Sequence, residues 1–175
     1  MIFDAQYWKR DLKRLANQLR NWQTQRRWPR ASFGSLEKSI MVGFYAIRRL
    51  LEAFQPMLPI ERADLYQLTV FPSSNKRFSQ LIWPNVHEHF DLAKPKTDRQ
   101  PLSFICNQVI HSYVFAPWSD ANGRLAGIFF SSDRKKHCEL FRMEIEAIIK
   151  LFEQVAMGKG KWLLRFGPEK NRVRM

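Results

Sequence analysis

Apolar residues recur at helical spacing near the start of the chain, and this periodicity is the strongest constraint on the fold. Intervals of three or four residues separate the members of one stripe: Trp8, Leu12, Leu15, Leu19 and Trp22. Such intervals return to one face of an α-helix, so residues 4–25 are predicted to form an amphipathic helix. Lys and Arg residues occupy the other faces. This helix is therefore expected to pack against a core and to present positive charge at the same time.

Three further helices are predicted from the chain. The second covers residues 36–54, with Ser35 as its N-cap and residues 28–34 as a linker before it, and it ends before Pro56. The third covers residues 102–114 and is entered after Pro101. The last covers residues 144–157, where apolar positions again recur at helical spacing, and is closed by Gly158.

Shorter β-prone segments lie between these helices. Asn122-Gly123 is a turn signal between the runs 113–118 and 125–131, which are predicted to form a hairpin. Residues 139–143 are a candidate third strand. The stretch from 55 to 100 is proline-rich and irregular, with a short strand at 65–71 and a helical turn at 78–83. The expected fold is mainly α, with a small β-hairpin or three-stranded sheet near the C-terminus.

Composition predicts one folded domain over residues 1–157, followed by a basic C-terminal tail over residues 158–175. Hydrophobic residues make up 45% and aromatic residues 14%, which is far too apolar for a disordered chain. No apolar stretch reaches the roughly 20 residues of a membrane span, and no secretory signal is predicted. Cys106 and Cys138 lack metal-site spacing and are expected to be reduced thiols. We therefore expect a cytoplasmic protein with no metal and no cofactor.

The net charge of +13 is concentrated at the two ends of the chain. Residues 1–30 hold eight Lys or Arg against two Asp, and residues 158–175 hold six against one Glu, so these ends carry +11. Such segregation favours RNA or another polyanion as the partner, because cations on a protein release counterions from phosphates. The candidate nucleic-acid-binding residues are Arg26, Arg27, Arg30, Arg49, Lys159, Lys161 and Arg165. Interleaved candidates for base stacking are Trp22, Trp28 and Trp162. The alternative is a solvated basic surface that binds nucleic acid without specificity.

A polar stripe runs along the predicted helix 102–114. Ser103, Asn107 and His111 follow one another at four-residue spacing, whereas apolar side chains surround most of the remaining helix. Leaving such groups buried without hydrogen-bond partners costs about 1–3 kcal/mol each. The stripe therefore either bonds to the interior of the protein or faces a cleft, and both alternatives stay open.

The run from Cys106 to His111 resembles the motif of the HEPN superfamily, in which an Arg, a polar residue that is often Asn, three variable residues and a His lie on one helix. Asn107 and His111 match this pattern, and Cys106 stands at the Arg position. The resemblance implies a HEPN-like helical bundle and a metal-independent endoribonuclease of a toxin or defence system. It also implies a homodimer with both motifs in one cleft, and a protein partner such as an antitoxin.

The resemblance also implies catalytic roles. In such enzymes a ribose 2′-OH attacks the adjacent phosphate and leaves a 2′,3′-cyclic phosphate. His111 would transfer the proton, because imidazole titrates near neutral pH, and Asn107 would orient it. A cation must stabilise the transition state, and Arg48, at the margin of the apolar face of the second helix, is the substitute for the missing Arg. Arg49 is the second choice, and the alternative role of Arg48 is an ion pair with Glu52 one turn later.

Two other interpretations follow from the same residues. Because Cys106 replaces the Arg, the domain is alternatively a catalytically inactive HEPN-like module that binds nucleic acid or protein. A further alternative is a scaffold whose basic ends meet an acidic protein in a larger complex. The sequence leaves open whether the protein is an enzyme.

Overall fold

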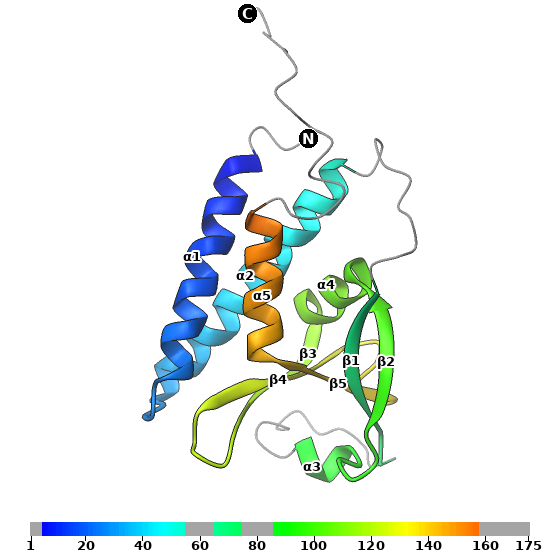
Figure 1. The fold of residues 1–175 in the computed structure, drawn as a ribbon. Coiled ribbons are helices and arrows are strands. Elements are labelled where there is room, and N and C mark those ends of the chain that lie inside the picture. The colour runs from blue at the N-terminus through cyan, green and yellow to red at the C-terminus, as the bar shows by residue number, and fades with distance from the viewer. Residues whose placement is uncertain (1–4, 55–64, 75–85, 158–175) are drawn as a thin grey trace, which may run out of the picture.

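The computed structural model describes residues 5–54, 65–74 and 86–157, and within them the chain forms a five-stranded antiparallel sheet with helices packed on it (Figure 1). The helices are α1 (Ala5–Gln23), α2 (Arg30–Phe54), α3 (Val86–His89), α4 (Leu102–Ile110) and α5 (Ile145–Ala156). The strands are β1 (Leu65–Pro72), β2 (Lys96–Pro101), β3 (Ser112–Ser119), β4 (Leu125–Ser132) and β5 (Glu139–Glu144). This part of the chain therefore has an α/β fold.

The sheet has the strand order β2-β1-β5-β4-β3, so segments far apart in the sequence lie side by side. β3, β4 and β5 form an antiparallel meander, and β1 joins it by pairing with β5. One row across the sheet shows the register: Val70 lies opposite Phe141, Phe141 opposite Phe130, and Phe130 opposite Phe115. All four side chains are buried in the main core.

Helices α1, α2, α4 and α5 cover this face of the sheet (Figure 1). Phe104 of α4 packs edge-on against Phe141 of the row, with 5.6 Å between ring centroids. The ring of Phe152 in α5 lies against the backbone of α2 at Gly43, and Phe44 packs edge-on against it at 5.5 Å. The helices are thus fixed to the sheet and to one another by aromatic packing.

The opposite face of the sheet carries a smaller apolar cluster. Val86 at the start of α3 and Phe90 just after it pack with sheet residues that include Phe71. Arg142 lies on this face, with its guanidinium 5.6 Å from the ring centroid of Phe71 and 5.2 Å from that of Trp118. Both faces of the sheet therefore bury apolar side chains.

The prediction of a mainly α fold with a small hairpin or three-stranded sheet is wrong, and so is the helical bundle, because the sheet has five strands. The strand not predicted from the sequence is β2, whose residues Lys-Thr-Asp-Arg-Gln-Pro contain no apolar side chain before the final proline. β2 exists because it pairs with β1 at the edge of the sheet, from Leu65 opposite Pro101 to Val70 opposite Lys96. An exposed edge strand needs no apolar alternation, so periodicity does not reveal it.

Other predicted elements are confirmed, with changed bounds. The strand at 65–71, the hairpin and the third strand appear as β1, β3–β4 and β5, and the first and last helices as α1 and α5. Helix α2 begins at Arg30, and Ser35 lies inside it and donates to the carbonyl of Ala31 at 3.0 Å. Helix α4 ends at Ile110, because the residues from Ser112 onward pair with β4. The predicted turn at 78–83 and the basic tail lie outside the described residues.

The close packing at Gly43 leads to a stability prediction. A Cβ at this position would overlap the ring of Phe152, so Gly43→Ala forces the core apart. Overpacking outweighs the better helix propensity of alanine, and the free energy of unfolding is expected to fall by about 1–2 kcal/mol. Urea unfolding followed by circular dichroism measures this change.

Gly34→Ala in the same helix is the matched control. A Cβ at Gly34 meets open space, so this variant should gain up to about 1 kcal/mol from helix propensity alone. Equal stability of the two variants would contradict the packing of α5 against α2.

Candidate functional site

Helix α1 presents a basic surface to solvent. Its apolar stripe is buried in the core, so its charged side chains point outward. The exposed cations of this helix are Arg10, Lys13, Arg14 and Arg20. Asp11 pairs with Arg14 at 3.6 Å, and Glu153 of α5 pairs with Arg20 at 2.5 Å. These two carboxylates offset part of the charge and leave a positive surface.

The turn from α1 to α2 extends this surface. Arg26, Arg27 and Arg30, all predicted to bind nucleic acid, are exposed. Among the residues that the structure describes, none of the three forms an ion pair. They present full positive charges to solvent, and we call the exposed cations of α1 together with these three arginines the basic surface.

Two of the three tryptophans expected to stack on bases take part in packing. Trp22 and Trp28 are half-buried and lie against the main core. The indole Nε1 of Trp28 donates to the carbonyl of Gln25 at 3.2 Å, and its ring lies 5.4 Å from that of Phe33. The candidates at the C-terminal end of the chain lie outside the described residues: Lys159, Lys161, Trp162 and Arg165.

The polar stripe of α4 faces solvent. Ser103, Asn107 and His111 are all exposed, whereas Cys106 on the inner side of the helix is fully buried. His111 occupies the C-cap position, and its backbone N–H donates to the carbonyl of Asn107 at 3.1 Å. Of the two alternatives for this stripe, an internal network is therefore excluded.

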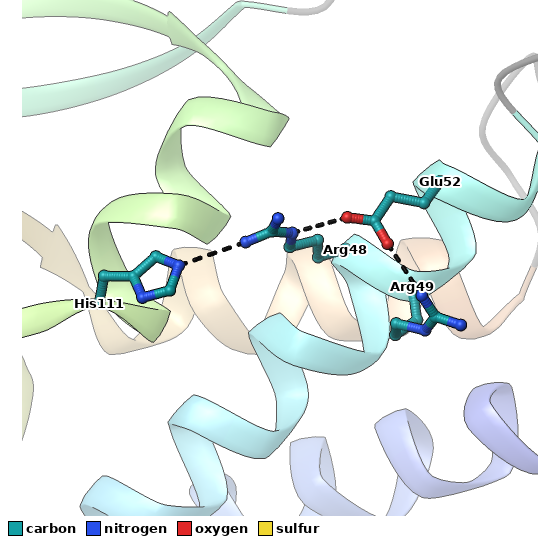
Figure 2. A network of polar contacts seen from close by, with 4 residues as sticks. All are labelled: Arg48, Arg49, Glu52 and His111. Carbon is teal, nitrogen blue, oxygen red and sulfur yellow. Dashed lines mark hydrogen bonds and ion pairs between the residues drawn. The ribbon is translucent and has the colours of Figure 1, made fainter.

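Arg48 of α2 reaches the imidazole of His111 (Figure 2). Nη1 of Arg48 lies 3.4 Å from Nε2 of His111. A guanidinium only donates hydrogen bonds, so a hydrogen bond across this contact requires Nε2 to be the acceptor. The fold thus brings Arg48 to the stripe that carries Asn107 and His111, from a position 63 residues before His111.

Glu52 binds the same arginine (Figure 2). Nε of Arg48 donates to Oε1 of Glu52 at 2.8 Å, and Nη1 of Arg49 donates to Oε2 at 3.0 Å. The hydrogen bond from Arg48 is the main cause that lowers the pKa of Glu52, and Arg49 adds to it. The predicted ion pair between Arg48 and Glu52 therefore forms, and it coexists with the contact between Arg48 and His111. Because Glu52 neutralises one of two adjacent positive charges, less charge is left for a phosphate than the sequence suggested.

Cys106 lies in the core at the position where the HEPN motif has Arg. Burial raises the pKa of its thiol to about 12, and the charge of Arg48 only partly opposes this effect. The residue at this position does not reach solvent, so a cation beside His111 has to come from another element. In this fold the cation comes from α2.

The turn between β4 and β5 lies beside His111. The backbone N–H of Asp133 donates to the carbonyl of His111 at 3.3 Å. Lys136 pairs with Asp133 at 2.5 Å, and its Nζ lies 3.8 Å from the ring centroid of Tyr113. This turn therefore places the cation of Lys136 on the exposed ring of Tyr113, which follows His111 by two residues in β3.

Sequence reasoning missed two exposed tyrosines, Tyr7 of α1 and Tyr45 of α2. Neither belongs to the apolar stripe of its helix, so periodicity does not single them out. A different signal could have identified them: each is a large aromatic residue on the polar face of a predicted helix.

Comparisons with known proteins do not assign this chain to a class: no family model matches it, and no curated protein or solved structure gives a significant match. In the described ranges, no helix is both long and apolar enough to cross a membrane. Nor do the described His, Cys, Asp and Glu side chains gather in groups of three that would suit a metal ion.

The burial of Cys106 predicts a difference in thiol reactivity. The thiolate is the reactive form, so Cys106 should resist Ellman's reagent in the native protein while the exposed Cys138 reacts. Absorbance during labelling should report one reactive thiol per chain, and a second only after denaturation. Native Cys138→Ser protein should remain unlabelled; rapid labelling of this variant would show that α4 does not bury Cys106.

Proposed function

We propose that the protein binds RNA through the basic surface of α1 and the α1–α2 turn. The observation that carries the proposal is the exposure of Arg26, Arg27 and Arg30 without carboxylate partners among the described residues. Arginine forks match phosphate oxygens in a bidentate way, and the release of counterions from RNA drives such binding. The tail would add cations to the same partner. A cytoplasmic location, where RNA is abundant, agrees with two free cysteines.

A second candidate function is metal-independent RNA cleavage at His111, favoured by its contact with Arg48. With its Nε2 unprotonated, His111 would accept the proton of a ribose 2′-OH, which attacks the adjacent phosphate to form the cyclic phosphate and expel the 5′-oxygen of the next nucleotide. The leaving 5′-oxygen would take its proton from water, and His111 would later lose its proton to solvent. Because Arg48 contacts Nε2 in the free protein, a bound phosphate would have to draw the guanidinium away from it. The same movement would place the cation on the developing charge.

In this second function Asn107, one helical turn before His111, would orient the imidazole or the phosphate. By its HEPN resemblance, cleavage would require a homodimer with two such clusters in one cleft, and an antitoxin-like protein would restrain it. The inactive module remains the alternative, because Glu52 holds Arg48 and Arg49 in ion pairs.

Binding to a labelled RNA should depend on salt and on the three turn arginines. Replacing Arg26, Arg27 and Arg30 together by Gln removes three phosphate partners. The slope of log affinity against log salt should then fall by about 2, since each contact to single-stranded nucleic acid contributes about 0.7. Fluorescence anisotropy over a salt series measures the slope.

The matched control replaces three exposed lysines outside the basic surface, Lys94, Lys96 and Lys150, by Gln. It changes the net charge by the same amount and should leave the slope nearly unchanged. Equal losses in both variants would mean that only net charge matters, and an absence of RNA binding by the unaltered chain would refute the proposed function.

Cleavage predicts a separate result. With a chelator present, the protein should cut a labelled RNA and leave 2′,3′-cyclic phosphate ends, and His111→Ala should slow this by at least about 100-fold, because general acid–base catalysis contributes that much. The matched control, His87→Ala at an exposed site on α3, should cut as before. Intact RNA with the unaltered protein, or undiminished cutting by His111→Ala, would leave the inactive module as the better description.

A further inference from the structure

An exposed patch of large side chains lies where α1 and α2 meet. Tyr7 is 59% exposed, Tyr45 46% and Val42 41%, and we call these three residues the tyrosine patch. Trp8, next to Tyr7 in α1, contacts Tyr45 of α2 with 5.9 Å between ring centroids. The ring of Tyr45 therefore rests on a half-buried indole, which itself follows Tyr7 in α1. A ring supported in this way loses little freedom when a flat partner covers it.

Cations surround the tyrosine patch. The guanidinium of Arg10 lies 5.1 Å from the ring centroid of Tyr7. On α2, Lys38 precedes Val42 by four residues and Arg49 follows Tyr45 by four, so helical geometry puts both on the face that carries the patch. The neighbouring carboxylates already form ion pairs: Asp11 pairs with Arg14, and Glu52 pairs with Arg48 and Arg49.

Aromatic rings interleaved with cations suit one kind of partner better than others. A purely apolar protein surface would have to bury these charges without partners, which is costly. Single-stranded nucleic acid instead offers a flat base and a negative phosphate at every nucleotide. A duplex offers the phosphates but keeps its base faces stacked inside.

We propose that the tyrosine patch is a stacking platform for single-stranded RNA, with bases on Tyr7 and Tyr45 and phosphates on Arg10 and Arg49. This inference rests on the proposed RNA-binding function and names its substrate class. Arg48 precedes Arg49 in α2 and contacts His111, so a strand that crosses α2 from the tyrosine patch leads toward the exposed stripe of α4.

The experiment compares two double variants in fluorescence anisotropy with a short labelled oligouridylate. Tyr7→Ala with Tyr45→Ala removes both rings and should weaken binding by about tenfold or more, with an unchanged salt slope because no charge is lost. Tyr7→Phe with Tyr45→Phe keeps both rings and should bind within about twofold of the unaltered protein. Oligouridylate annealed to its complement should bind more weakly than the single strand.

A third variant keeps the test decisive if the alanine pair unfolds. Tyr7→Leu with Tyr45→Leu preserves apolar area without a ring, and it should lose affinity for RNA as the alanine pair does. Undiminished binding by the leucine pair would overturn the inference.

Light scattering tests whether a second copy of the chain covers the patch instead. If the alanine pair dissociates a dimer and still binds RNA as before, the patch is a contact between two copies and the inference is wrong. RNA binding that depends on Arg26, Arg27 and Arg30 but not on the tyrosine rings would refute the platform alone, whereas no RNA binding at all would refute the proposed function.

Discussion

The pairing of β1 with β5 is the contact on which the rest of the structure depends. It joins residues about seventy positions apart, with Val70 opposite Phe141, and turns a three-stranded meander into a five-stranded sheet. β1 adds Val70 to the row of three phenylalanines in the meander, and burial of such apolar side chains under the helices is the main favourable term in folding. Because α5 follows β5 directly, the same pairing also sets where α5 meets α1 and α2.

Helix α2 separates the two surfaces to which the proposals assign a function. On one side it packs against α1 and shares the tyrosine patch with it, and on the other it packs against α4 and places Arg48 beside His111. Its exposed carboxylate Glu52 holds both arginines of this region. An exposed ion pair contributes less than about 1 kcal/mol to stability, so a phosphate competes with Glu52 for Arg48 at small cost. The charge on this face is therefore available to a ligand although it is paired in the free protein.

In α4, the local sequence pattern sets which side chains share a face, and the fold sets where that face points. The four-residue spacing of Ser103, Asn107 and His111 predicted one stripe on one helix, and the stripe exists because α4 is helical through Ile110. Whether it faced the core or solvent depended on which side of α4 packs on the sheet, and Cys106 is on that side. The place of Arg48 on the edge of a predicted apolar face makes it a candidate, and its actual distance to His111 comes from the packing of α2 against α4.

Features that rest on neighbouring residues can be predicted from the sequence. Local periodicity, turn chemistry and composition are enough to predict the apolar stripes of α1 and α5, the hairpin around Asn122-Gly123 and the basic excess of the first thirty residues. Long-range packing, in contrast, makes β2 a strand, ends α4 before Ser112, and packs Trp28 while it leaves Tyr45 exposed. The physical reason is that these outcomes are set by partners distant in the chain: an edge strand is stabilised by backbone pairing that needs no apolar pattern, and the exposure of a ring depends on what folds over it.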